Sequence, residues 1–209
     1  MGESLKDKNK YLLFGIVAAN LAVYYAAVQN DTIVTGDWSG LVQGVGNALP
    51  AGFGLVLIGI INAQISAETK SRIVFMRWRN PLPGCEAFTR LASADPRIDL
   101  SSIQSAYGPL PTDPLQQNAL WYKMYKSVET DPSVIQVHRD YLLTRDYTGL
   151  SLMMAIVLGA AGFIQIPSAG TAVLYFALLL VQFILSSRSA RNHGRRFVTT
   201  VLALKGAGR

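Results

Sequence analysis

The sequence predicts an all-α integral membrane protein with four transmembrane helices. Half of its 209 residues are hydrophobic, and they are concentrated in four long apolar stretches, which is typical of a multi-pass membrane protein. No useful length of the chain alternates apolar and polar residues as a half-buried strand would. Helices are therefore expected both in the membrane and outside it.

The positions of the basic residues predict the topology. All nineteen Lys and Arg residues fall within 6–10, 70–145 and 188–209, and the loops 29–50 and 167–170 contain none. Basic residues near membrane spans stay on the cytoplasmic side. We therefore expect both termini and the region between spans two and three to be cytoplasmic, in a plasma membrane and most simply a bacterial inner membrane.

These patterns divide the chain into five parts. They are a cytoplasmic tail (1–10), a transmembrane hairpin (11–67) with spans 11–28 and 51–67 and an outer amphipathic loop 29–50, a cytoplasmic helical region (68–148), a second hairpin (149–187) with spans 149–166 and 171–187, and a basic amphipathic cytoplasmic tail (188–209). The charged start before an apolar run also resembles a signal peptide. A retained first span and a cleaved signal both stay open.

Two helices are predicted to extend out of the bilayer and to hold the cytoplasmic region between them. The helical pattern of the second span continues over 51–79, where Pro81 stops it. Asp131 as N-cap and Pro132 at the first helical position begin a helix that nothing breaks before Pro167. The turn after Pro167 is so short that spans three and four must form an antiparallel hairpin. Short helices are expected at 100–107 and 115–128.

Motifs of catalysis and cofactor binding are missing from the sequence. It has no phosphate-binding loop, nucleophile elbow or His-Glu-x-x-His motif. The single cysteine, Cys85, and two histidines exclude an intramolecular disulfide and an ordinary zinc or haem site. We interpret Asp95, Asp99, Asp113 and Asp131 mainly as helix caps. We therefore predict a non-enzymatic protein without catalytic, cofactor or metal residues.

Six residues are candidates for binding a partner or ligand. Arg77-Trp78-Arg79 is suited to a phosphate-bearing ligand or a lipid headgroup, or to anchoring where the second span leaves the membrane. The apolar face of the helix at 115–128 includes further candidates. The candidates are Arg77, Trp78, Arg79, Trp121, Tyr125 and His138.

The four spans contain no Asp, Glu, Lys, Arg or His, which argues against ion-coupled transport. Their amides either form hydrogen bonds between helices or line a shared pore. These intramembrane polar residues are Asn20, Asn62, Gln64, Gln165 and Gln182. Just before the third span, Arg145-Asp146-Tyr147 repeats Arg139-Asp140-Tyr141, and we interpret this as coincidence with local ion pairing.

Two further segments are predicted to contact membrane lipids. Gly36, Gly40 and Gly44 recur every fourth residue, as in a helix with a small-residue packing face that lies at the outer interface or enters the membrane as a gating element. The tail 188–209 is suited to lying on the anionic cytoplasmic leaflet, with packing against a partner helix as the alternative.

The function predicted from these features is that of a homo-oligomeric membrane component whose cytoplasmic region docks a soluble partner or senses a signal. The alternative is a signal-gated pore or membrane-disrupting effector, such as bacteria use in stress or antiviral defence. A lipid-modifying enzyme ranks third because no nucleophile–base pair can be named. The nearly balanced charge of 68–146, ten basic against nine acidic residues, argues against nucleic-acid binding.

Overall fold

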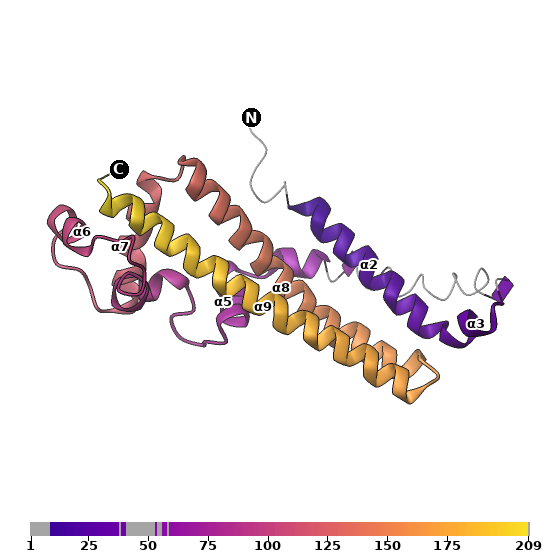
Figure 1. The fold of residues 1–209 in the computed structure, drawn as a ribbon. Helices are drawn as coiled ribbons and strands as arrows, with labels where there is room; N and C mark the ends of the chain where they lie inside the picture. The colour runs from indigo at the N-terminus through magenta and orange to yellow at the C-terminus, as the bar shows by residue number, and fades with distance from the viewer. Residues whose placement is uncertain (1–8, 38, 41–52, 54–55, 58, 209) are drawn as a thin grey trace.

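A computed structural model describes residues 9–37, 39–40, 53, 56–57 and 59–208, and all regular structure in these ranges is helical (Figure 1). The all-α class is thereby confirmed. The elements are α2 (Lys10–Val28), α3 (Asn30–Thr35), α5 (Ala67–Phe75), the 3₁₀ turn η1 (Pro83–Glu86), the π turn η2 (Ala87–Leu91), α6 (Leu100–Tyr107), α7 (Pro114–Ser127), α8 (Pro132–Gln165) and α9 (Ala169–Gly206).

Three of the described helices, α2, α8 and α9, are long and apolar enough to cross a membrane. Only 6% of the apolar window of α2 is buried inside the chain, and Tyr11 and Phe14 are 81% and 68% exposed. Apolar surface of this extent needs lipid or protein to cover it. The chain is therefore a membrane protein with three candidate spans. The predicted span 51–67 lies partly outside the described residues, although 59–64 are helical.

The longest elements, α8 and α9, form the predicted antiparallel hairpin and lie side by side over most of their length (Figure 1). At 34 and 38 residues they are about 51 and 57 Å long, well beyond the hydrocarbon thickness of about 30 Å. The Ser168 side chain caps α9 by accepting a hydrogen bond from the Thr171 N–H. Towards the turn, α2 packs on the hairpin through a core that includes Tyr24, Leu158 and Tyr175.

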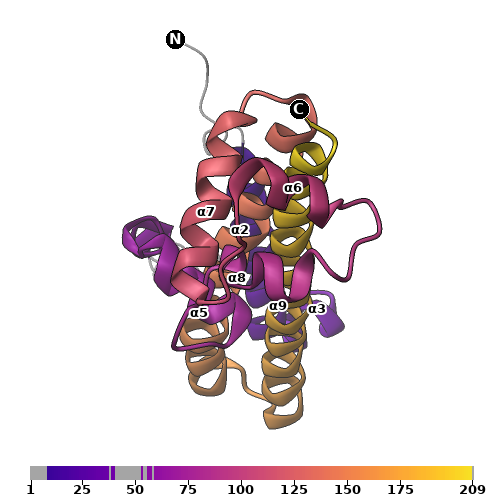
Figure 2. The same ribbon diagram turned by 90° about the vertical axis from the view of Figure 1, so that its left-hand side faces the viewer.

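The opposite end of the hairpin is covered by a helical unit that we call the head. It consists of α5, η1, η2, α6 and α7 with the ends of α8 and α9 that they cover. Figure 2 shows α6 and α7 against these ends, while the α8–α9 turn projects beyond the head. The fully buried centre of the head core contains Ile103, Met124, Val134, Val198 and Val201.

Three helices of the head begin at the predicted aspartate caps. The carboxylates of Asp99, Asp113 and Asp131 accept backbone N–H groups in the first turns of α6, α7 and α8. An N-cap aspartate satisfies amides that have no partner within the helix, so these three interpretations are confirmed. Asp95 instead accepts the N–H of Arg97 at 3.1 Å in a loop and pairs with the guanidinium of the same residue.

The prediction of one continuous helix over 51–79 is wrong. Ser66 adopts an extended backbone, and its Oγ accepts the Thr69 N–H at 3.1 Å, so Ser66 caps a new helix, α5. Met76 then takes a left-handed conformation with φ 51° and ends α5 at Phe75. Serine favours the N-cap because its hydroxyl can satisfy a backbone amide. Because of this break, α5 is a separate element that contacts both α8 and α9.

The segment 188–209 differs from the lipid-surface tail that we expected. Helix α9 continues without a break to Gly206, and the apolar face of this segment packs inside the head core. That face consists of Phe197, Val198, Val201 and Leu202, none of which is more than 4% exposed. Burial of apolar side chains inside the chain replaces the expected contact with lipid. The arginines of the segment include the exposed Arg188, Arg195 and Arg196, and their attraction to anionic lipid stays a prediction.

Candidate functional site

A buried cluster of charges lies where the membrane helices enter the head. Lys70 Nζ of α5 is 3.0 Å from Asp146 Oδ1 of α8, and the two side chains are 2% and 7% exposed. The same oxygen is 3.1 Å from Arg145 Nη2, whose side chain is 11% exposed. Buried ions are costly to desolvate, and breaking such a pair is strongly destabilising. The cluster therefore joins α5 to α8 firmly.

An amide of the predicted second span completes this contact. Asn62, which is 6% exposed, donates from Nδ2 to the backbone oxygen of Asp146 at 3.3 Å. A Cβ at Gly149 would lie 2.8 Å from Asn62 Oδ1, closer than such contacts allow. Gly149 is thus needed so that the span can approach α8 at this level.

Helix α5 is also fixed by hydrogen bonds further along its length. The hydroxyls of Ser71 and Tyr141 are 3.2 Å apart in the buried interior. The Val74 carbonyl accepts from Ser187 Oγ at 3.1 Å and from Arg191 Nε. Both partners of Val74 belong to α9, so α5 is attached to each arm of the hairpin. We call these contacts, with the charge cluster and Asn62, the junction.

The junction lies at the end of the apolar part of the hairpin that is nearer the head. Asp146 is about 29 Å from the end of α8 at Gln165, at 1.5 Å per residue. This length nearly equals the hydrocarbon thickness of about 30 Å. The charged cluster therefore occupies the level at which a spanning α8 would leave the apolar layer.

A cavity of about 360 Å³ adjoins the junction between α2, the helical residues near 60, and α8. Its polar lining consists of Asn9, Asn62, Lys70 and Asp146, and apolar side chains form the rest. Asn62 Oδ1 is buried and has no hydrogen-bond partner among the described residues. The cavity therefore combines a polar inner end with apolar walls.

Neither Lys70 nor Asp146 was predicted as a site residue. We interpreted Arg145-Asp146-Tyr147 as local ion pairing, and Arg145 does pair with Asp146. This interpretation missed Lys70, the partner of Asp146 on another helix. Each missed residue is three residues from the apolar stretch of a predicted span, Lys70 after the second span and Asp146 before the third. That shared position is a signal, because an ion near a bilayer core needs a partner.

Three of the predicted binding residues come together in an aromatic cluster around Phe197. The ring of His138 stacks on Phe197 with centroids 4.6 Å apart, while Trp121 and Tyr125 contact the same ring edge-on at 5.1 and 5.2 Å. Tyr125 Oη and His138 Nδ1 are 3.3 Å apart. Trp121 is only 6% exposed. The cluster joins α7, α8 and α9 inside the head and offers little surface to a partner.

His138 is neutral at physiological pH. Burial lowers the pKa of its imidazole to about 4, and the positive charge of Arg145 adds to the effect. A histidine of this kind lacks the pKa near 7 that suits a general base at neutral pH. Burial also raises the pKa of the neighbouring Tyr125, so the pair stays uncharged.

The predicted triplet Arg77-Trp78-Arg79 lies on the surface after α5. Arg77 forms an ion pair with Glu86, Trp78 is 85% exposed, and Arg79 is exposed. The two guanidiniums therefore do not act as one clamp around the indole. Arg77 belongs to a separate group of arginines near Glu86.

The predicted intramembrane amides fall into different environments. Gln182 Nε2 donates to Tyr147 Oη at 2.8 Å across the hairpin, and Asn62 bonds to α8 as described above. Asn20 donates to Ile16 O of its own helix at 2.9 Å. Gln64 and Gln165 are exposed. The five residues therefore do not line one common space within a single chain.

The predicted glycine-spaced helix of the outer loop is interrupted. Gly36 has φ +72° and ends α3 instead of lying within a helix. Asp37 then accepts the Gly40 N–H at 3.0 Å, which starts a new turn. Gly44 lies outside the described residues. The packing face predicted from Gly36 and Gly40 is therefore wrong, because Gly36 is itself the left-handed residue that ends α3 before the turn at Gly40 begins.

No family model, curated protein or solved structure matches this chain. Its function must therefore be inferred from the geometry. Among the described residues no three His, Cys, Asp or Glu side chains are grouped as a metal site would require. Chemically, the junction is suited to holding helices in one arrangement and to binding a polar group from the adjoining cavity.

The junction predicts an unequal response to two matched carboxylate changes. Asp146→Asn should lower the free energy of unfolding by about 3 kcal/mol or more, because it removes a carboxylate shared by two buried cations. Glu68→Gln should cost less than about 1 kcal/mol, because its pair with Arg72 is exposed. Denaturant unfolding in detergent, followed by helical circular dichroism, measures both. Equal losses would remove the junction as a stabilising contact.

His138 predicts a loss of stability in mild acid. The unfolded chain binds a proton at His138 near pH 6.5, whereas the folded chain binds it only near pH 4. Stability is therefore unaffected above pH 6.5 and falls from there towards pH 4, by at most about 1.4 kcal/mol per pH unit. Thermal melts at pH 7 and pH 5 should show a smaller shift for His138→Gln than for the unchanged protein. An identical shift in both would assign the effect to other groups.

Proposed function

We propose that this chain is a non-enzymatic, four-span plasma-membrane protein whose cytoplasmic head docks a soluble protein. Four segments cross the membrane in this topology: α2, residues 51–67, and the apolar parts of α8 and α9. Both termini and the head lie on the cytoplasmic side. The basic residues of the head and of the end of α9 support this orientation. The level of the charged junction supports the same membrane boundary.

The topology predicts opposite labelling of two exposed alanines. Ala169 begins α9 at the turn, and Ala106 lies on α6 of the head. In a Cys85→Ala background, a membrane-impermeant maleimide should label the Ala169→Cys variant in intact cells. It should label Ala106→Cys only after permeabilisation. Labelling of Ala106→Cys in intact cells would contradict the proposed orientation.

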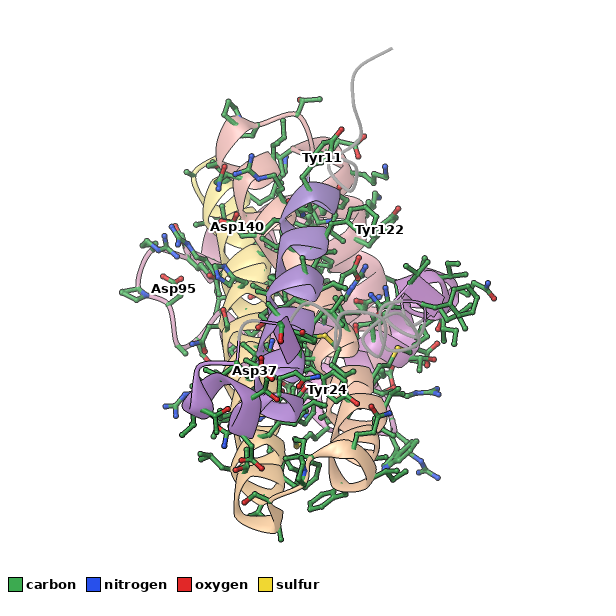
Figure 3. The ribbon with its side chains drawn as sticks, turned by 90° about the vertical axis from the view of Figure 1, so that its right-hand side faces the viewer. Tyr11, Tyr24, Asp37, Asp95, Tyr122 and Asp140 are labelled. Atoms are coloured by element: carbon green, nitrogen blue, oxygen red, sulfur yellow. The ribbon has the colours of Figure 1, made fainter. Side chains whose placement is uncertain are left out.

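The observation that carries the docking proposal is the outer face of α7. Leu115 and Tyr122 are 66% and 51% exposed, seven residues apart on one helical face, with Ala119 between them and Lys126 beyond. Figure 3 shows Tyr122 at the outer edge of the head. Large apolar side chains on a rigid helix that is fixed from behind by Trp121 and Met124 are typical of a protein-binding surface.

The basic fringe of this face indicates the chemistry of the partner. Lys123 and Lys126 are exposed beside Tyr122, and Lys126 already pairs with Glu129 at 2.6 Å. A partner with an apolar groove bordered by acidic residues would complement the face. This assignment moves the expected contact from Trp121 and Tyr125, which pack against the head core, to the adjoining exposed face of α7, where the ring of Tyr122 is 5.8 Å from that of Tyr125.

Homo-oligomerisation is part of the proposal. Gln64 is exposed near the inner end of the second predicted span, where another helix would satisfy its amide better than lipid. The exposed sides of α2 and α9 supply the apolar surface for such contacts. A signal-gated pore is the second candidate, and the polar cavity beside the junction is the observation that favours it.

Photo-crosslinking tests the docking face. A photoreactive amino acid in place of Tyr122 should give one discrete adduct with a soluble protein in cells. Leu115→Ser should reduce the adduct at least about fivefold, because losing an interface anchor costs about 1 kcal/mol or more. The fold should be unaffected, since Leu115 is exposed.

The matched control places the same photoreactive group at Gln104, an exposed residue of α6. It should give no such adduct. The absence of an adduct at Tyr122 in the folded protein would contradict docking. Ion flux through liposomes containing the purified protein would then favour the pore.

A further inference from the structure

Four arginines lie near one another beside the junction, and two of them pair with the same carboxylate. Glu86, at the end of η1, accepts hydrogen bonds on Oε1 from Arg77 and on Oε2 from Arg90, whose Nε is 2.7 Å away. Helix α9 contacts η1 and η2 and supplies the other two members, Arg195, which lies within electrostatic range of Glu86, Arg90 and Arg77, and its neighbour Arg191. These residues belong to three separate segments, so only the folded head brings them together. We call Arg77, Arg90, Arg191 and Arg195 the arginine cluster.

The charge of this cluster is not balanced by the chain. Glu86 already serves both Arg77 and Arg90, while Arg195 has no carboxylate within ion-pair distance among the described residues. Burial and the neighbouring Arg90 lower the pKa of Arg195, Glu86 opposes the shift, and Arg191 and Arg77 add to it. Four guanidiniums beside one paired carboxylate therefore leave the cluster with an excess of positive charge.

The cluster lies at the depth of lipid headgroups in the proposed topology. From Ala169, the start of α9, Arg191 and Arg195 are about 33 and 39 Å along the helix. The hydrocarbon core takes about 30 Å, and the headgroup layer adds several ångströms on each side. Helix tilt of about 20° shortens the projected distances further. Both side chains therefore reach the layer in which lipid phosphates lie.

The segment beside the cluster has the form of a membrane anchor. Met76 and Asn80 have φ values of 51° and 50°, a conformation that is unfavourable for residues other than glycine. In this segment Met76 and Trp78 are 63% and 85% exposed. An indole at the headgroup level is favourable because its ring is apolar and its N–H is polar. Apolar insertion and excess positive charge thus occur side by side.

We propose that the arginine cluster holds the phosphate of an anionic phospholipid in the cytoplasmic leaflet, with Trp78 inserted beside it. Arginine suits this ligand because its planar guanidinium forms paired hydrogen bonds with phosphate oxygens. The site rests on the proposed topology, which the maleimide labelling tests separately. It is distinct from the expected contact of the whole tail 188–209 with lipid, because two of its four arginines come from 77–90.

Fluorescence quenching by brominated lipid tests the site in the full chain. The protein is placed in nanodiscs of phosphatidylcholine that contain acyl-brominated phosphatidylglycerol, or acyl-brominated phosphatidylcholine for comparison. Subtracting the signal of Trp78→Phe isolates Trp78 from the other two tryptophans. Trp78 should be quenched preferentially by the anionic lipid. Arg90→Gln/Arg195→Gln should lower that preference about tenfold, since each basic side chain near the surface contributes to anionic-lipid binding.

A matched double variant controls for total charge. Arg97→Gln/Lys123→Gln removes two exposed positive charges elsewhere on the head and should keep the preference. Equal losses in both double variants would overturn the site in favour of non-specific attraction. Inorganic phosphate, added at constant ionic strength, should leave the preferential quenching of Trp78 by anionic lipid unchanged. Loss of that preference would overturn the lipid site in favour of a site for a soluble anion. Unchanged quenching in Arg90→Gln/Arg195→Gln would also refute it.

Discussion

The pairing of Lys70 with Asp146 is the contact on which the arrangement of this molecule depends. Both side chains of this pair are nearly inaccessible to water, and the pair joins a short helix of the head to α8 of the membrane hairpin. An ion of either sign at this depth is tolerated only beside its partner. The position of α5 therefore determines where Asn62, Ser71 and Val74 make their contacts. These contacts in turn determine where the second predicted span meets the head.

The sequence predicted more of the helices of the head than of the contacts in the junction. Asp99, Asp113 and Asp131 stand before clear helical patterns, and a cap acts on its own next three residues, so local information was sufficient. The long α8 and the hairpin turn at Pro167 followed from uninterrupted apolar periodicity. The break at Ser66 was missed because serine is tolerated inside helices as well as at their starts. Only the tertiary position of α5 decides between these two roles.

Contacts between distant segments were beyond the sequence patterns. Lys70 and Asp146 are 76 residues apart, and charge alone does not indicate which of several ions meet. Trp121, Tyr125 and His138 were predicted as partner- or ligand-binding residues, and the structure brings them together around Phe197. Their role in core packing depends on Phe197, which comes from a segment that the basic composition assigned to the lipid surface. The same misassignment concealed the position of Arg195 near Glu86 and the hydrogen bond from Arg191 to the Val74 carbonyl.

The unbroken course of α9 has a mechanical consequence. The helix passes from the turn through the junction to the far side of the head, and the Val74 carbonyl holds it near its midpoint through Ser187. About 27 Å of helix lies on one side of this point and about 29 Å on the other. A rod held at its middle is a lever with equal arms, so a tilt of about 10° moves each end by about 5 Å in opposite directions. Displacement of the turn by lipid or by a neighbouring chain would therefore be transmitted along α9 towards the α6 end of the head, because α9 is unbroken from Ala169 to Gly206.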